Sequence, residues 1–267
     1  MVGIHSKASP HLSTIIMDWL QFGALLLAGT FTGVVNSLAG AASLVSFPVL
    51  LALGLPPSVA HATNFVSLTP GNAAAAWAYR KDLRRLLKPV LIAVVVTGLG
   101  TTVGANLLLA SGDRVFMGLV PYLILFAVLV YWFGGRLQMD TGSAYDASKV
   151  VLSLPIVLAL LAMSVYGGYF GAGIGILALA IMRMAGFTDF HDANAIKNLL
   201  MSSISLFAVI WFHNGQLISW PHAAVVASGS LIGGILGIRY ARNIPQQWLH
   251  RFIISFGIGL AVYYGLA

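Results

Sequence analysis

The chain has 267 residues, of which 59% are hydrophobic and 8% charged, and its mean hydropathy is +0.91. A soluble domain carries about 25% charged residues, so this composition excludes an ordinary soluble protein and allows about ten membrane crossings of roughly 20 residues each. Cysteine is absent, which excludes disulfides, thiolate metal sites and thiol catalysis, and we expect no metal and no cofactor. The net charge of +7 comes from bases in short loops beside apolar segments, so we attribute it to membrane topology and expect no nucleic-acid partner.

A polar tail at residues 1–16 precedes ten apolar segments. These are 17–39, 40–54, 61–79, 89–110, 115–134, 150–168, 171–185, 192–212, 221–239 and 248–266. Two of them, 40–54 and 171–185, are too short to cross a bilayer comfortably at the helical rise, and both begin with small residues. The sequence therefore predicts an all-α integral membrane protein of about ten segments.

The two halves of the chain repeat one another. A shift of 134 residues places Asn64 on Asn198 and Trp77 on Trp211, and each half has five segments with the short one second. We expect a first membrane repeat at 17–134, a polar linker at 135–149 and a second membrane repeat at 150–267.

Basic residues indicate how many segments cross. If all ten cross, one side of the membrane receives only Lys7 and Arg114. The other side then receives Arg80, Lys81, Arg84, Arg85, Lys88, Arg136, Lys149, Arg183, Arg239, Arg242 and Arg251. The positive-inside rule favours this division over the more even one that re-entrant short segments would give, although full crossing stays open. Five crossings per half would invert the repeats, with basic loops cytoplasmic and both termini outside the inner membrane.

Inverted repeats with one short, glycine-interrupted segment each are typical of transporters that bind substrate at the bilayer midplane. A helix that begins inside the membrane presents unpaired N–H groups and a partial positive charge, which favour an anion. We therefore assign the starts of the two short segments to substrate binding, at Gly40, Ser43, Gly171 and Gly173. Two further glycine pairs we assign to helix packing, Gly100/Gly104 and Gly233/Gly237.

Polar side chains within apolar segments give further candidates. Asn194, Lys197 and Asn198 stand at i, i+3 and i+4, which places them on one helix face. The repeat counterparts of the last two are Thr63 and Asn64, so the two polar faces could converge on one substrate. Lys197 could instead extend to the neighbouring loop or pair with Asp192.

Asn36 and Ser37 precede the first short segment and could complete this site. His61 opens the third segment and is the candidate for a proton-linked role. No carboxylate lies deep in any segment, which disfavours carboxylate-based ion relays. Asp189, His191 and Asp192 form the one cluster that an intramembrane enzyme acting on a lipid-phase substrate could use, but solvation of a loop explains it more simply.

Several of these stretches resemble a known family. Val35–Leu44 (VNSLAGAASL), followed by Pro48, is similar to the first motif of the TauE/SafE sulfite exporters, also called toluene-sulfonate uptake permeases. Gly167–Gly173 (GGYFGAG) and Ala193–Asn198 (ANAIKN) resemble the second motif. The resemblance covers nearly the whole chain, with the motifs in the same order.

The resemblance implies a secondary transporter of sulfite, sulfonate, sulfoacetate or a related anion. We expect no enzymatic activity and no ATPase subunit, because the chain lacks a phosphate-binding loop. The expected partners are the anion and the lipid bilayer, and a homo-oligomer is left open. Export is favoured, because expelling a monovalent anion from a negative cytoplasm gains about 2.3 kcal/mol per 100 mV. The alternatives are a proton-coupled importer, the intramembrane enzyme, and a non-transporting membrane partner.

Overall fold

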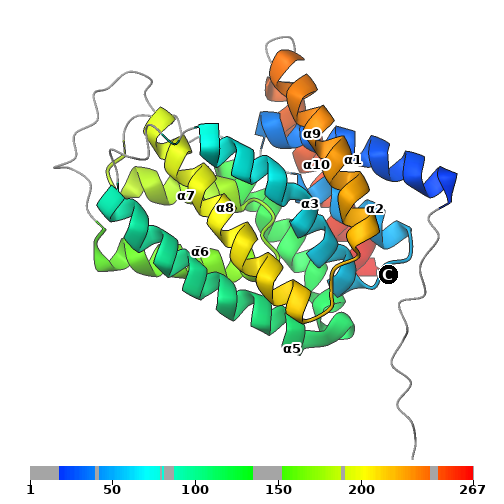
Figure 1. Ribbon diagram of the computed structural model, residues 1–267, viewed down its shortest axis with the longest axis horizontal. Coiled ribbons are helices and arrows are strands. Elements are labelled where there is room, and N and C mark those ends of the chain that lie inside the picture. Colours follow the sequence, from blue (N-terminus) through cyan, green and yellow to red (C-terminus); the bar gives the residue numbers. More distant parts are fainter. Residues whose placement is uncertain are drawn as a thin grey trace, which may run out of the picture.

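A computed structural model describes residues 18–39, 42–78, 80, 87–134, 152–187, 190–240 and 246–266, and all regular structure within these ranges is helical (Figure 1). The helices of the first half are α1 (Trp19–Ala39), α2 (Ser43–Ala52), α3 (Pro57–Ala78) and α5 (Leu87–Gly134). Those of the second half are α6 (Leu154–Tyr169), α7 (Ile174–Met184), α8 (Phe190–Asn214), α9 (Trp220–Tyr240) and α10 (Gln246–Leu266). The predicted all-α class is confirmed.

The helices have the length and composition of membrane helices. In the part of the chain that the structure describes, three stretches are long and apolar enough to cross a bilayer, Trp19–Asn36, Leu91–Phe133 and Asp192–Asn214. The 43-residue stretch is broken at Gly112, whose φ of 68° and ψ of 165° are not helical, so α5 consists of two arms. Large apolar side chains such as Leu99 and Ile235 are more than half exposed, as a lipid-facing surface requires.

The second helix of each half is short, as predicted. α2 has 10 residues and α7 has 11, so at the helical rise each spans only about half of a 30 Å hydrocarbon core. The tail at 1–16 and the linker at 135–149 lie outside the described residues, so the predicted domain boundaries stay predictions.

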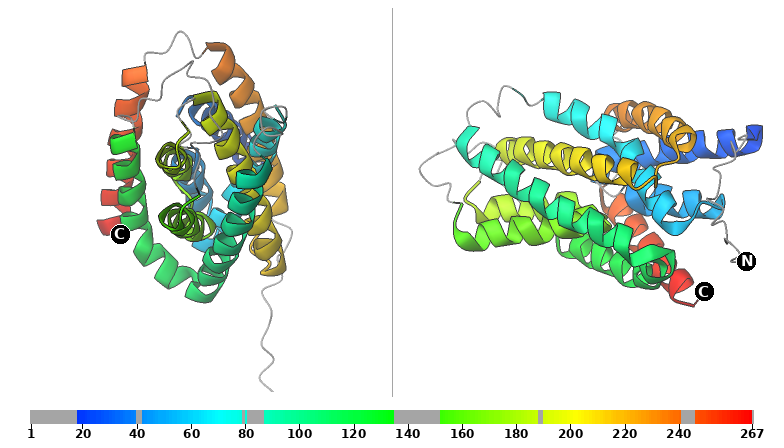
Figure 2. Two further views of the ribbon diagram at one scale, coloured as in Figure 1. Left: turned by 90° about the vertical axis from the view of Figure 1, so that its left-hand side faces the viewer. Right: turned by 60° about the horizontal axis from the view of Figure 1, so that its bottom comes forward.

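Close glycine contacts fix the direction of two helix pairs. A Cβ at Gly29 would meet Val226 and one at Gly33 would meet Ser230, so α1 and α9 run parallel (Figure 2, right). In the same way, Gly100 faces Leu161 and Gly104 faces Val165, so the first arm of α5 runs parallel to α6. The packing role predicted for Gly100, Gly104 and Gly233 is therefore confirmed, because each faces backbone atoms of a neighbouring helix.

Two other pairs run antiparallel. α3 and α8 cross where Asn72 Nδ2 donates a hydrogen bond of 3.0 Å to Ser205 Oγ, and Phe65 of α3 meets Phe212 of α8. In α10, Gly257 faces Val128 and the later Gly265 faces the earlier Pro121 of the second arm of α5. α3 and α8 are the third segments of the two predicted halves, and the second arm of α5 and α10 are the fifth segments. In inverted repeats, equivalent helices run in opposite directions. The exact ten-segment repeat stays a prediction, with which these directions agree.

Hydrogen bonds tie several helix ends together at one end of the bundle. The Ser58 N–H and hydroxyl donate to Asp113 Oδ1 at 2.9 and 2.6 Å, and Tyr169 Oη donates to Ser111 Oγ at 3.2 Å. The Ser219 N–H donates to Thr63 Oγ1 at 3.0 Å. We call this the Gly112 end, and it comprises residues 53–58, 111–113 and 215–222.

Asp113 stabilises the start of α3, because its carboxylate accepts an N–H of the first turn and complements the helix dipole. We expect Asp113→Ala to lower the free energy of unfolding by about 1–2 kcal/mol, measured as a lower melting temperature in detergent. Asp113→Asn keeps an acceptor oxygen and should lose less. An alanine variant as stable as the native protein would contradict this role.

Candidate anion site

The turn before α7 is built from glycines in the left-handed region. Gly171 and Gly173 have φ of 71° and 74°, which side chains other than glycine rarely allow. Tyr166 Oη fixes the turn by donating to the Ala172 carbonyl oxygen at 2.7 Å. Within the described residues, no acceptor is bonded to the N–H groups of Gly173 and Gly175. The start of α7 thus presents unpaired donors, as the predicted anion site requires.

This start lies inside the bundle. Gly104 faces the Tyr169 backbone and Gly171 faces Phe65. Gly104 precedes Gly112 by eight residues and Phe65 follows Pro57 by eight, so the turn lies about 12 Å from the Gly112 end at the helical rise. The contacts with α5 and α3 therefore both show that α7 starts inside the bundle and not at its Gly112 end.

The start of α2 lies at a comparable depth. Ser46 bonds to Asn64, seven residues into α3, and α2 begins three residues before Ser46. The Phe47 and Phe170 ring centroids are 5.9 Å apart, so the first turns of α2 lie beside the turn that precedes α7. The structure thus brings the two short segments together.

Neighbouring atoms fill the space beside the glycine turn that precedes α7. A Cβ at Gly171 would lie 2.7 Å from Phe65 Cε2, and one at Gly173 would lie 3.4 Å from the Ala127 carbonyl oxygen. Phe65 and Ala127 therefore leave little room beside Gly171 and Gly173 in this structure. Gly40 and the side chain of Ser37 lie outside the described residues, whereas Ser43 and Asn36 are partly exposed.

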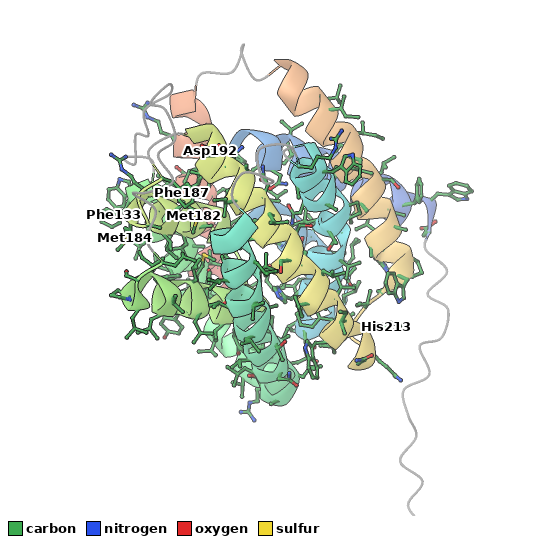
Figure 3. The ribbon with its side chains drawn as sticks, turned by 60° about the vertical axis from the view of Figure 1, so that its left-hand side comes forward. Phe133, Met182, Met184, Phe187, Asp192 and His213 are labelled. Carbon is green, nitrogen blue, oxygen red and sulfur yellow. The ribbon has the colours of Figure 1, made fainter. Side chains whose placement is uncertain are left out.

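Lys197 lies beside the first turn of α7. Its Cδ is 3.8 Å from the position of a Cβ at Gly175, and the residue is partly buried. Its ammonium has no hydrogen-bond or ion-pair partner in the described part of the chain, so it does not pair with Asp192. Asp192 and Asn194 do take part in interactions, and Asp192 lies at the opposite end of α8 from His213 (Figure 3).

The two predicted polar faces do not converge. Asn64 precedes the crossing residue Asn72 by eight positions, and Lys197 precedes the crossing residue Ser205 by eight. Because α3 and α8 are antiparallel, Asn64 and Lys197 lie on opposite sides of the crossing, each about 12 Å along its helix. Asn198 lies next to Lys197 on α8, and Thr63 lies next to Asn64 on α3. The predicted polar residues therefore form two separate regions. Asn72 and Ser205 are not among the predicted site residues, although a shift of 133 residues relates their two positions.

Asn64 is fully buried and incompletely bonded. Ser46 Oγ lies in hydrogen-bond contact with Asn64 Oδ1 and 3.2 Å from the Ala42 carbonyl oxygen, and Asn64 Nδ2 has no partner among the residues that the structure describes. A hydroxyl has one proton, so exchanging the two amide atoms would let Ser46 donate to Ala42 and accept from Asn64. In either orientation one amide atom of Asn64 is left without a partner, which costs about 1–3 kcal/mol.

His61 is also buried, with 1% of its surface exposed, and its Nε2 has no partner within the described ranges. Phenylalanines surround the imidazole with ring-centroid distances between 5.5 and 6.2 Å, and Phe170 stacks on it at an interplanar angle of 14°. We call them the aromatic cluster, which comprises Phe47, Phe65, Phe116, Phe170 and Phe212. Buried polar atoms are nearly always bonded in native proteins, so the unpaired atoms of His61 and Asn64 call for an explanation.

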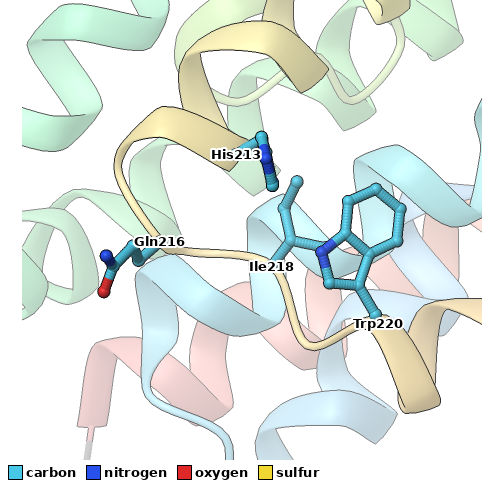
Figure 4. Close-up of a pocket in the computed structure, with 4 residues that line it drawn as sticks. All are labelled: His213, Gln216, Ile218 and Trp220. Carbon is cyan, nitrogen blue, oxygen red and sulfur yellow. The ribbon is translucent and has the colours of Figure 1, made fainter.

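Thr63 has a structural partner, because its hydroxyl accepts the Ser219 N–H. Ser219 Oγ in turn lies 2.7 Å from His222 Nδ1. A surface pocket beside this loop is lined by His213, Gln216, Ile218 and Trp220, none of them a predicted site residue (Figure 4). No group of three metal-ligating side chains occurs among the described residues, and Asp189 and the His191 side chain lie outside them.

Comparison with known proteins decides the family. A sequence model described as "Sulfite exporter TauE/SafE" matches residues 25–264. The chain belongs to this family. No solved structure matches the TauE/SafE chain.

Curated relatives of this TauE/SafE protein carry transporter names. A "Probable membrane transporter protein" of Haemophilus influenzae is 26% identical over 231 residues, covering 86% of this chain and 89% of the relative. "Probable membrane transporter protein ORF9" of a Sinorhizobium species is 25% identical over 240 residues, covering 89% and 90%. "Probable membrane transporter protein YfcA" of Escherichia coli K12 is 25% identical over 244 residues, covering 91% and 88%.

The family and the helices together establish a multi-pass membrane protein of a transporter family, and they confirm the resemblance found in the sequence. The names of the relatives point to transport and not to catalysis.

Proposed function

We propose that this protein is a secondary transporter that moves a small sulfur-containing anion, such as sulfite, a sulfonate or sulfoacetate, across the inner membrane. The observation that carries the proposal is Lys197, whose Cδ lies beside the first turn of α7 and whose ammonium has no hydrogen-bond or ion-pair partner in the described residues. A cation within a membrane helix is costly, so one without a counter-ion marks a place where an anion can bind. The sulfur chemistry of the substrate rests on the family name.

The anion would contact Lys197 and the unpaired N–H groups of Gly173 and Gly175. An ammonium and backbone donors at a helix start both favour negative charge, and charge-assisted hydrogen bonds to them are stronger than neutral ones. Asn194 and Asn198 share the Lys197 face of α8. The start of α2 would complete the site through Asn36, Ser37, Gly40 and Ser43, and Gly171 shapes the turn.

The two halves would alternate access around this site as inverted repeats. The antiparallel pairs α3/α8 and α5/α10 support the inversion, because each joins equivalent helices. By the positive-inside rule, the basic loops at 80–88 and 239–251 would lie in the cytoplasm, and the Gly112 end and both termini would then face outward. Export would then follow the membrane potential, which favours the exit of a monovalent anion by about 2.3 kcal/mol per 100 mV.

Sulfite flux in proteoliposomes tests this function. Vesicles loaded with sulfite should release it faster than protein-free vesicles, and an inside-negative potential should accelerate the release. Accumulation of sulfite against an inside-negative potential, driven by a proton gradient, would overturn export and favour the importer, for which His61 is the proton-linked candidate. Vesicles that release sulfite, thiosulfate, sulfoacetate and taurine no faster than protein-free controls would overturn the proposal.

A further inference from the structure

On one face of α3 lie two buried polar atoms that have no partner in the described part of the chain. His61 and Asn64 are three residues apart, so their side chains point in similar directions from the helix. That face is turned toward α2, because Asn64 bonds to Ser46 and His61 meets the ring of Phe47. The three polar side chains Ser46, His61 and Asn64 therefore form one group between α2 and α3, which we call the α3 polar group.

The α3 polar group is separate from the Lys197 site. It lies on the other side of the α3/α8 crossing and nearer the Gly112 end. An anion that leaves Lys197 toward that end would next meet these side chains. Together they can offer an amide N–H, an imidazole N–H and a hydroxyl, which are donors that suit a small oxyanion.

In this structure the aromatic cluster closes the α3 polar group. Phe170 stacks on His61, and Phe170 also meets Phe47 and Phe116, at centroid distances of 5.9 and 6.2 Å. Phe170 directly precedes the glycine turn of α7, so a movement of that turn would carry the ring with it. The ring that covers His61 is thus linked to the helix start that would hold the anion.

We propose that Ser46, His61 and Asn64 form a second anion station on the exit path, and that Phe170 closes it in this structure. The inference rests on the proposed transport function. The station carries no lysine or arginine, so it binds the anion more weakly than Lys197 does, which suits release, because conduction requires sites from which the ion can leave. Asn64 Nδ2, which carries two hydrogens, and the imidazole N–H of His61 would donate to the passing anion.

Substitutions that preserve shape test the station. Asn64→Leu and His61→Phe remove the donors, and we expect each to lower sulfite flux at least tenfold while sulfite binding at Lys197, measured by calorimetry, changes less than twofold. Thr32→Val is the matched control, because Thr32 Oγ1 is also buried without a partner but lies on α1. Its flux should stay at the native level.

His61→Phe should fold, since it removes no hydrogen bond at Nε2. Asn64→Leu removes the contact with Ser46, whose hydroxyl can still donate to the Ala42 carbonyl oxygen. His61→Gln, which keeps a donor, should retain more flux than His61→Phe and serves if Asn64→Leu is poorly folded. Native flux in His61→Phe and in every folded variant of Asn64 would overturn the station.

Cysteine labelling tests the closure independently. The chain has no cysteine, so Ser46→Cys introduces a single thiol. We expect a membrane-impermeant, negatively charged methanethiosulfonate to label it slowly, and at least tenfold faster when Phe170→Ala is added. Phe31→Ala, which alters a ring on α1 that pairs with Phe252, is the control and should not change the rate. Equal labelling rates with and without Phe170→Ala would overturn the gate.

The outcomes separate the two proposals. If the native protein moves no anion and Lys197→Ala changes nothing, the transport function itself is wrong. If the native protein transports sulfite while the His61 and Asn64 variants match it, the station alone is wrong.

Discussion

Lys197→Ala is expected to weaken anion binding by about 1–3 kcal/mol, which corresponds to roughly 5- to 150-fold in affinity. The loss follows because Lys197 lies beside the first turn of α7 and its ammonium has no partner among the described residues that could replace the anion. Isothermal calorimetry or thermal stabilisation by sulfite, thiosulfate, sulfoacetate and taurine measures the effect and also ranks the substrates.

Two further substitutions at this position separate charge from shape. Lys197→Met keeps the aliphatic contact with α7 but removes the charge, so it should lose as much affinity as the alanine variant. Lys197→Arg should recover affinity only in part, because a planar guanidinium and a compact ammonium differ in shape. Arg251→Met, at an exposed cation of α10, is the control for general loss of charge. Affinity that is unchanged in Lys197→Ala and Lys197→Met would remove Lys197 from the site.

Gly233→Ala is expected to destabilise the protein by more than about 3 kcal/mol. The new Cβ would collide with the Thr30 carbonyl oxygen of α1, and a clash between two backbones cannot be relieved by a change of rotamer. The parallel packing of α1 and α9 would have to open. Melting temperature and the fraction of monodisperse protein in detergent report the loss.

The neighbouring residue provides the matched control. A Cβ at Gly234 meets nothing within 4 Å, so Gly234→Ala should be neutral or should stabilise α9 by up to about 1 kcal/mol through helix propensity. The two variants differ by one position and share the same chemical change. Similar melting temperatures for both would show that the close approach of α1 and α9 does not limit stability.

Helix positions were predictable from the sequence because the bilayer imposes a simple length and polarity rule. Predicted and observed bounds of most segments differ by only a few residues, as for 17–39 against Trp19–Ala39. The third segment starts four residues earlier than predicted, at Pro57, because proline is favoured in the first turn and the Asp113 carboxylate caps it. That carboxylate lies 55 positions away in the sequence, so no local pattern could indicate it.

The candidate site was predictable in part. The glycine turn before α7 was found from its small residues, and Lys197 was found because a base in an apolar helix is rare. Asn64 and Lys197 do not meet as suggested. Repeat symmetry shows that two positions are equivalent, but it does not give the distance between them in the folded protein. The packed ring around His61 was missed, since its five phenylalanines come from different parts of the chain.

The sequence by itself determined the membrane class, the short second helix of each half, and some of the glycines on which helices pack. These features depend on local composition and spacing, which lipid and backbone geometry act on directly. Only the tertiary structure decided that α3 and α8 cross antiparallel at Asn72 and Ser205, and that the polar side chains divide into two regions. The angle and register of a crossing depend on how all side chains of both helices fit together, which no single segment specifies.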